Sequence, residues 1–233
     1  MAFVEQFELI YHRAAERKGG IAALEALLSK PRTSEQLKQL TDAECLSEFS
    51  KKIFQSGFVW SVVEKKWPEF EQLFFGFEPA KILLMSDGML AEKATDPRII
   101  RNATKVFAIR DNALMINDIA EKYGSFGQFL AQWPDTDTIG LWAYLKQHGN
   151  RLGGNVGAYG LRFLGKDTFI LSQDVEAYLR SSGLVEGGLT SQKNLKAIQQ
   201  QFNLWREQSG RSHQEISKVI SMSVGDNHVG MAT

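Results

Sequence analysis

Cysteine is almost missing from this sequence of 233 residues, which contains only Cys45. One cysteine excludes an internal disulfide framework and any metal site built from several thiolates, so the sequence favours a cytoplasmic setting. Long apolar runs are missing as well, because nothing approaches the roughly 18 consecutive apolar residues of a membrane-spanning helix. The first residues lack the basic start and continuous apolar stretch of a signal peptide. We therefore expect a cytoplasmic protein with no membrane partner.

A surplus of charge is also missing, since 27 basic residues balance 27 acidic ones. This balance argues against a general polycation but allows a local basic face. Such a face is indicated between residues 145 and 166, where no acid occurs. The basic residues of this stretch are Lys146, Arg151, Arg162 and Lys166. The alternative interpretation is a solvated helix surface.

Alternation with a period of two is scarce, and apolar residues recur at steps of three and four, which predicts an all-α protein. The clearest helix lies in "RIIRNATKVFAIRDNALMINDIAEKYG" and ends at Gly124. Its expected core positions are Val106, Ile109, Ala113, Ile116 and Ala120. Residues 41–67 are expected to form one or two helices, either broken near Gly57 or ending before Pro68, and Pro79 is expected to begin another. Further helices are predicted over 3–17, 21–28, 138–148, 155–164, 173–182, 190–208 and 212–222.

A glycine-rich turn, "HGNRLGGNVGAY", joins two of these predicted helices. Such a turn can direct several backbone N–H groups and the positive end of a helix dipole toward one phosphate. Glycine permits close approach of a nucleic-acid backbone, and an arginine adds a charge-assisted contact. The predicted phosphate-binding residues are Gly149, Arg151, Gly153, Gly154 and Gly157. A plain corner between two helices is the alternative.

Four ordered segments resemble the type I 3-methyladenine DNA glycosylases, a family of helix-hairpin-helix DNA glycosylases. They are "IFQSGFVWSVVEKKWPEFEQLFFGFEPAKILLM", "IIRNATKVFAIRDNA", "LKQHGNRLGGNVGAY" and "LGGNVGAYGLRFLGKDTFILSQDVEAYLRSSGLV". The resemblance spans about residues 45–182. It implies one all-helical domain over residues 1–233, a helical bundle in which two lobes flank a cleft. Residues 1–44 would form N-terminal helices, 45–182 the family-like core with a hairpin at about 148–157, and 183–233 bracing helices.

The resemblance also implies a base pocket and a catalytic aspartate. Trp60 would stack on the extruded base, Gln55 would hydrogen-bond its edge, and Tyr159 is a weaker pocket candidate. Asp174 matches the aspartate that begins a helix after the hairpin in the wider superfamily, where it would stabilise positive charge on the sugar. The alternatives are a core tryptophan, a structural glutamine and an aspartate that only caps its helix.

Two departures from the family change what can be carried over. Best-known members place a base-contacting glutamate eight residues before the tryptophan, and here that position is Lys52. A lone lysine would repel a cationic purine, so we expect an i,i+4 pair with Glu48 that neutralises its charge. Bifunctional members place a lysine about eighteen residues before the aspartate, where this sequence has Val156. The sequence thus predicts an enzyme without lyase activity.

The zinc site of those members, two cysteines and two histidines, has no counterpart in the sequence. Beside Cys45 there are four histidines without metal-ligand spacing, His12, His148, His213 and His228. We therefore expect no metal and no other cofactor.

The predicted function is hydrolysis of the N-glycosidic bond of an alkylated purine such as 3-methyladenine, during base-excision repair. The predicted partner is double-stranded DNA with a damaged base, bound by a monomer. One alternative is a non-catalytic helix-hairpin-helix DNA-binding protein derived from a glycosylase. Another is a helical domain that binds only protein partners.

Overall fold

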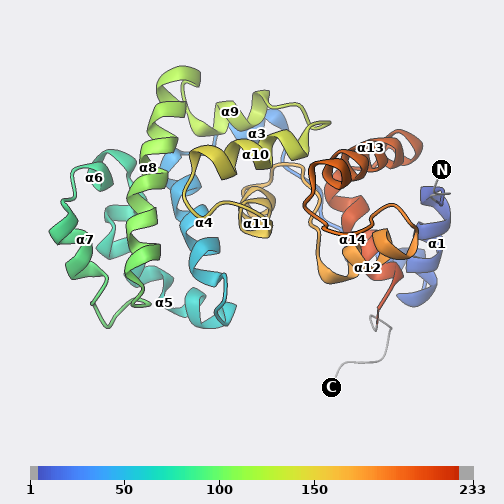
Figure 1. The fold of residues 1–233 in the computed structure, drawn as a ribbon, viewed down its shortest axis with the longest axis horizontal. Coiled ribbons are helices and arrows are strands. Elements are labelled where there is room, and N and C mark those ends of the chain that lie inside the picture. Colours follow the sequence, from blue (N-terminus) through green and yellow to red (C-terminus); the bar gives the residue numbers. More distant parts are fainter. Residues whose placement is uncertain (1–4, 226–233) are drawn as a thin grey trace. The chain divides into compact units, whose positions relative to one another are not determined.

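The computed structural model describes residues 5–225, in which the regular elements are helices and no strand occurs (Figure 1). The first helices are α1 (Phe7–Arg17), α2 (Ile21–Glu25), α3 (Ser34–Lys38), α4 (Asp42–Gln55) and α5 (Trp60–Leu73). Next come the 3-10 turn η1 (Phe75–Phe77), α6 (Pro79–Leu83), α7 (Asp87–Lys93), α8 (Ala103–Tyr123) and α9 (Phe126–Gln132). The last are α10 (Thr138–His148), α11 (Asn155–Leu164), α12 (Gln173–Ser181), α13 (Gln192–Ser209) and α14 (His213–Ser223).

These helices confirm the predicted all-α class. None of the helices described between residues 5 and 225 combines the length and apolarity required to traverse a bilayer.

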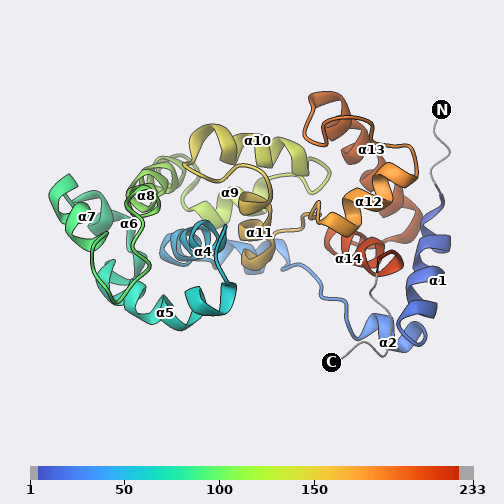
Figure 2. The same ribbon diagram turned by 60° about the horizontal axis from the view of Figure 1, so that its bottom comes forward.

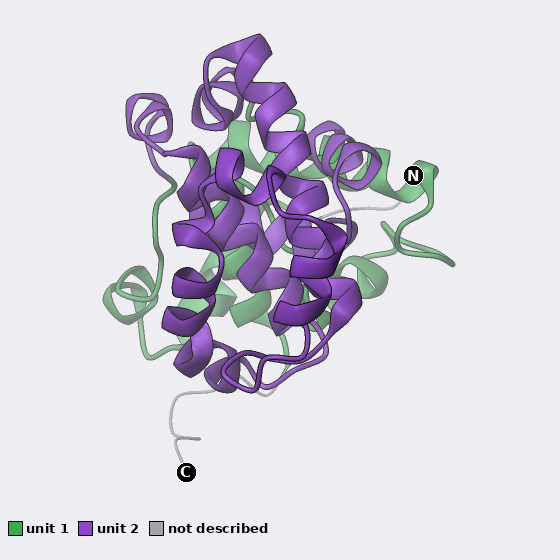
Figure 3. Ribbon diagram, turned by 90° about the vertical axis from the view of Figure 1, so that its left-hand side faces the viewer, with its two compact units in different colours: residues 1–31, 135–139, 167–233 green, residues 32–134, 140–166 purple. Residues whose placement is uncertain are grey.

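The chain divides into two compact units, and each is discontinuous in sequence (Figure 3). Unit 1 contains residues 1–31, 135–139 and 167–233, and unit 2 contains residues 32–134 and 140–166. The expectation of one domain over residues 1–233 stays a prediction. The hairpin and the tryptophan motif both fall in unit 2, whereas Asp174 falls in unit 1.

Unit 2 is built around α4, which lies between α8 and α11 (Figures 1 and 2). The α8 positions predicted for the core are buried, except that Ala120 is half-buried. Gly160 of α11 faces Phe49 of α4, and a Cβ at Gly160 would lie 2.5 Å from the Phe49 ring. Because only hydrogen occupies that position, the two helices approach closely and the fully buried Phe49 ring fills the space between them.

Two helix boundaries differ from the sequence prediction, and one helix is additional. Helix α5 does not end before Pro68 but continues through it to Leu73. Proline removes one helical hydrogen bond, and burial of Trp67 and Phe70 on either side of it outweighs that loss. Helix α8 begins at Ala103 rather than near residue 98, because the Asn102 side chain accepts a hydrogen bond from the Lys105 amide and caps it. Helix α7 was not predicted.

Unit 1 contains a buried polar cluster at the start of α14. The Asp167 carboxylate accepts hydrogen bonds from the backbone amides of His213 (3.1 Å) and Gln214 (2.8 Å). It also forms an ion pair with Arg206 at 2.9 Å. The imidazole of His213 is completely buried, and its Nδ1 lies 3.3 Å from the Thr138 hydroxyl. Burial lowers the pKa of His213 to about 4, so the folded protein holds this ring neutral.

The buried His213 predicts a specific pH dependence of stability. The unfolded chain binds a proton on this histidine near pH 6.5, whereas the folded protein binds it only near pH 4. The stabilisation is therefore complete above pH 6.5 and is lost as the pH falls toward 4, by up to about 3 kcal/mol in the free energy of unfolding. Urea unfolding of the wild type between pH 4 and 7 measures this loss. His213→Gln should flatten the profile and the exposed-site control His12→Gln should not; equal profiles for wild type and His213→Gln would contradict the prediction.

Candidate functional site

The predicted hairpin is present between α10 and α11, and two of its residues have a positive φ angle. Arg151 has φ +62° and Gly154, the N-cap of α11, has φ +58°. With ψ −142°, Gly154 occupies a region open almost only to glycine, and no atom stands within 4 Å of where its Cβ would be. The Arg151 side chain is exposed at the tip of the turn. The turn thus presents bare backbone and a cation to its surroundings.

Two other glycines lie inside the hairpin, where there is no room for a side chain. A Cβ at Gly157 would lie 2.3 Å from the Leu152 carbonyl oxygen. One at Gly149 would lie 2.7 Å from the Leu152 side chain and 2.8 Å from the Leu145 carbonyl oxygen. The absence of a side chain at these two positions therefore allows the turn to fold on itself. The Gly153 position is less crowded, with the Lys146 side chain at 3.4 Å.

A buried asparagine that the sequence analysis did not single out fastens the hairpin to α8. The Asn112 side chain donates to the Asn150 carbonyl (3.0 Å) and accepts from the Asn150 amide (2.8 Å). The Asn150 side chain in turn donates to Asp111 at 2.6 Å. The signal in the sequence was an asparagine inside an otherwise apolar stripe, since a fully buried amide requires specific partners.

The basic residues around the hairpin do not all lie on the surface. Lys146 and Arg151 are exposed, whereas Lys166 is buried and donates to the Trp133 carbonyl at 2.6 Å. Arg162 is half-buried. The exposed positive charge of this stretch is therefore concentrated at the hairpin itself.

A pocket of about 480 Å³ lies in unit 2 beside the hairpin helix. Its walls come from the end of α4, the following loop, the start of α5 and the start of α11. The lining residues are Lys52, Gln55, Ser56, Gly57, Phe58, Val59, Trp60, Asn155, Val156 and Tyr159. The base-pocket candidates Trp60, Gln55 and Tyr159 are brought together here with Lys52, which stands at the position of the family's base-contacting glutamate. Their role in binding a base stays a prediction.

Lys52 is the charged group of this lining, and its side chain is only 2% exposed. Its Nζ lies 3.1 Å from Glu48 Oε1, which confirms the predicted i,i+4 pair. It also donates to Gln55 Oε1 at 2.9 Å. Burial lowers the pKa of Lys52, and the Glu48 carboxylate opposes that shift.

Aromatic rings surround the same ammonium group. Nζ of Lys52 lies 3.3 Å from the centre of the Phe163 ring and 4.7 Å from that of Trp60. Trp60 makes edge contacts with Tyr159 (5.4 Å between centroids) and Phe163 (6.1 Å). Trp60 is 40% exposed, so it is not a core tryptophan but forms part of an accessible wall.

The loop between α4 and α5 carries exposed apolar side chains that the sequence analysis did not assign. Phe58 and Val59 are 46% and 66% exposed. The buried ammonium of Lys105 holds this loop by donating to the carbonyls of Phe54 (3.3 Å) and Ser56 (2.6 Å). These contacts satisfy carbonyl groups at the end of α4 and fix the loop at the pocket mouth.

Asp174, the predicted catalytic residue, is half-buried in the first turn of α12 in unit 1. It is the second helical residue, and the N-cap is Ser172, whose hydroxyl accepts from the Val175 amide. The alternative role of Asp174 as the cap is therefore wrong.

No group of three or more histidine, cysteine, aspartate or glutamate side chains able to hold a metal ion occurs within residues 5–225. His228 lies outside the described residues. Cys45 is buried, and its burial raises the pKa of the thiol.

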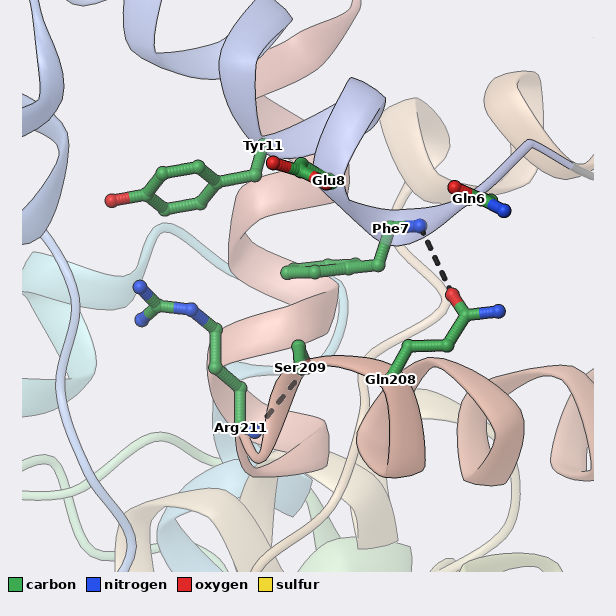
Figure 4. Close-up of a pocket in the computed structure, with 7 residues that line it drawn as sticks. All are labelled: Gln6, Phe7, Glu8, Tyr11, Gln208, Ser209 and Arg211. Carbon is green, nitrogen blue, oxygen red and sulfur yellow. Dashed lines mark hydrogen bonds between the residues drawn. The ribbon is translucent and has the colours of Figure 1, made fainter.

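A second pocket, of about 400 Å³, lies in unit 1 (Figure 4). Its wall includes the Phe7 amide, which donates to Gln208 at 3.1 Å, and Arg211, whose guanidinium lies 4.7 Å from the centre of the Tyr11 ring. Arg211 is paired with Glu25 and Glu215. None of the site residues predicted from the sequence lines this pocket.

The close packing inside the hairpin predicts that Gly157→Ala destabilises the protein. Its methyl group would overlap the Leu152 carbonyl oxygen, and such overpacking costs about 1–3 kcal/mol. Gly153→Ala is the matched control, since its methyl group meets Lys146 at an ordinary contact distance. Urea unfolding compares the two variants with the wild type. A Gly157→Ala variant as stable as Gly153→Ala would show that the turn can relax.

Solved structures similar to this chain are DNA glycosylases. One of 3-methyladenine DNA glycosylase I is 18% identical, with a TM-score of 0.49 over 70% of this chain and 91% of that one. The Staphylococcus aureus enzyme is 22% identical, with a TM-score of 0.48 over 71% and 87% of the two chains. The Methanocaldococcus jannaschii 8-oxoguanine glycosylase/lyase, bound to DNA containing 8-oxoguanine, is 14% identical, with a TM-score of 0.52 over 91% and 95%. The last likeness confirms the helix-hairpin-helix glycosylase fold.

None of the curated proteins compared with the chain matches it. A family model described as methyladenine glycosylase matches residues 38–191, a region that includes α4, the pocket, the hairpin and Asp174. Since this match covers more than half of the sequence, the chain belongs to the methyladenine glycosylase family.

Proposed function

We propose that the protein is a monofunctional DNA glycosylase that hydrolyses the N-glycosidic bond of an alkylated purine such as 3-methyladenine in double-stranded DNA. The observation that carries the proposal is the juxtaposition, within unit 2, of an aromatic-walled pocket and a glycine-rich hairpin. Trp60 and Tyr159 line the pocket, and Tyr159 belongs to the helix that the hairpin begins. A base-excision enzyme requires both features, one for the damaged base and one for the DNA backbone.

The hairpin would bind the phosphates next to the lesion. Its bare backbone at Gly153 and Gly154 and the exposed cations Arg151 and Lys146 suit a phosphate group. Phosphate contacts position a protein on the duplex without reading sequence, as a search for rare lesions requires. The exposed Phe58 and Val59 at the pocket mouth would fill the gap that the extruded nucleotide leaves in the base stack.

The pocket would receive the extruded base. Extrusion costs a few kcal/mol, less for a damaged base, and stacking on an aromatic face offsets part of it. The 40% exposure of Trp60 and its edge contact with Tyr159 leave such a face available. An alkylated purine departs readily because it already carries positive charge, so the protein needs to stabilise only the charge that develops on the sugar. We assign that role to the Asp174 carboxylate, which would also orient the attacking water.

The surroundings of the amines near the pocket support the proposal of hydrolysis without strand cleavage. Val156, at the position expected for a Schiff-base lysine, lines the pocket with an apolar side chain. The lysine that does line it, Lys52, is held against Glu48 and Gln55 and covered by aromatic rings. An amine so engaged is a poor nucleophile.

We expect the wild-type protein to release free base from methylated duplex DNA without cutting the strand. Asp174→Asn should lower the rate of release by roughly a hundredfold, because general acid–base and electrostatic groups contribute about that much. Trp60→Ala should also lower the rate of base release, because the extruded base loses its aromatic stacking partner. Chromatography measures the rate of base release, and gels show whether the DNA strand is cut. Borohydride trapping detects a Schiff base between the enzyme and the DNA. Glu176→Gln, on the same helix as Asp174, is the control.

A wild type that binds alkylated DNA but releases no base, with Asp174→Asn binding equally well, would favour a non-catalytic DNA-binding protein.

Phosphate binding by the hairpin predicts a salt dependence of DNA affinity. Arg151→Ala should weaken binding to intact and damaged duplexes alike and reduce the slope of log K against log salt concentration by about 1. Fluorescence anisotropy over a range of salt concentrations measures the slope. Lys81→Ala, an exposed cation on α6, should leave the slope unchanged. An unchanged slope for Arg151→Ala would show that Arg151 does not contact a DNA phosphate.

A further inference from the structure

The loop of residues 56–59, which joins α4 to α5 and lines the mouth of the pocket, is held by a lysine of another helix. Lys105 lies in the first turn of α8 and is 7% exposed. Its Nζ donates to the carbonyl oxygens of Ser56 (2.6 Å) and Phe54 (3.3 Å) and lies 5.2 Å from the centre of the Phe58 ring. One ammonium group thus binds the backbone where the loop begins and faces the ring that the loop exposes.

The loop contains a glycine, so contacts from outside decide which conformation it adopts. Gly57 has φ +76°, and no atom lies within 4 Å of where its Cβ would be. Two backbone hydrogen bonds lead from the loop back to α4, from the Ser56 amide to the Lys52 carbonyl (3.0 Å) and from the Phe58 amide to the Gln55 carbonyl (3.1 Å). Because glycine permits many backbone conformations, the contacts with α8 restrict the loop further.

The tip of the loop carries two apolar side chains in an unusual setting. Phe58 and Val59 are 46% and 66% exposed at the mouth of a pocket. Apolar side chains that enter a DNA base stack have this size and exposure. Such a side chain has to meet the duplex in a defined orientation, and a loop ordered in advance avoids the entropic cost of ordering it during binding. Phe58 is the larger of the two and is the one that faces Lys105.

Burying the Lys105 ammonium is unfavourable by itself. Burial lowers the pKa of this lysine, and the charge of Arg151 adds to the shift. The carbonyl oxygens of the loop and the rings of Phe54 and Phe58 compensate the charge. A methionine would fill the same space without this cost but would leave the carbonyl groups without their donor. The contacts of the lysine therefore serve the geometry of the loop.

The helix that carries Lys105 also fixes the hairpin. Asn112 lies about two helical turns further along the same face of α8 and forms two hydrogen bonds with the Asn150 backbone. Arg151, the next residue of the hairpin, is near enough for its charge to act on Lys105. The loop, the hairpin and α8 all belong to unit 2. One face of α8 thus sets the position of the loop relative to the phosphate contacts proposed for the hairpin.

We propose that Lys105 is a positioning residue for base extrusion, which holds Phe58 in the orientation in which its ring enters the base stack as the damaged nucleotide leaves it. Lys105 acts through the loop and takes no part in cleavage of the glycosidic bond. This inference rests on the glycosylase function proposed above and concerns the step that precedes cleavage. The effect of the lysine should therefore depend on whether the base has to be withdrawn from a paired stack.

The test compares two duplexes that contain the same lesion. A strand with a single adenine is methylated and annealed to a complement that carries either thymine or a tetrahydrofuran abasic analogue opposite the adenine, and the initial rates of 3-methyladenine release are measured. Lys105→Met should lower the rate opposite thymine by roughly tenfold and the rate opposite the abasic analogue by less than about twofold, because an unpaired base is extruded at lower cost. The ratio of the two rates should thus fall.

Lys66→Met is the matched control for the loss of a lysine that binds backbone carbonyls. Lys66 donates to the carbonyl oxygens of Pro97 (3.0 Å) and Arg98 (2.9 Å) and does not line the pocket. Its replacement removes the same kind of contact at another place in unit 2. The ratio of the two rates should stay at the wild-type value in this variant.

Phe58→Ala tests the proposal independently, should Lys105→Met fail to fold. It should lower the rate opposite thymine and spare the rate opposite the abasic analogue. Adding Lys105→Met to Phe58→Ala should cause no further fall in the ratio, because the lysine acts through that ring.

Three outcomes would overturn the role of Lys105 while leaving glycosylase activity established. They are a wild-type ratio in Lys105→Met, a wild-type ratio in Phe58→Ala, and a salt slope of DNA binding lowered by about 1 in Lys105→Met, which would make the lysine a phosphate contact. Release of 3-methyladenine from neither duplex by the wild type would instead overturn the proposed function itself.

Discussion

The close approach of α4 and α11 determines where the pocket can form. Gly160 offers no side chain, so the Phe49 ring of α4 reaches the backbone of α11. The same approach places the last turn of α4, with Lys52 and Gln55, opposite the first two turns of α11, with Val156 and Tyr159. A larger residue at Gly160 would separate both walls of the pocket at once. Packing in the core thus fixes the distance across which a base would be held.

The chemistry of the pocket is set by one buried ammonium group. Burying a charge is unfavourable unless it is paired, and Lys52 meets a carboxylate, an amide oxygen and two aromatic rings. Removing Glu48 would leave this charge unpaired, which is more costly than removing both partners. The fold of the family is therefore retained, while the pocket lining has the hydrogen-bond donor Lys52 where the best-known members have the acceptor glutamate.

Much of the site was visible in the sequence because its signals are local. The hairpin follows from closely spaced glycines, and the Glu48–Lys52 pair follows from helical periodicity. Features that depend on distant parts of the chain were not predicted. The role of Asn112 in fastening the hairpin becomes apparent only in the folded structure, where its side chain forms hydrogen bonds with the Asn150 backbone. The buried position of Lys166, which the charge pattern placed on a basic face, likewise depends on Trp133, far away in sequence.

The order of the chain through the two units has a consequence for biosynthesis. Unit 2 is complete once residue 166 has left the ribosome, whereas α1 and α2 belong to a unit whose remaining helices come after residue 167. Helix α1 packs on α14, so the apolar side chains Phe7 and Ile10 remain uncovered until the last helix has been translated. The nascent chain therefore carries the uncovered amphipathic segment α1 while the pocket beside the hairpin is already formed, and stalled or truncated translation would leave that segment exposed to chaperones and proteases.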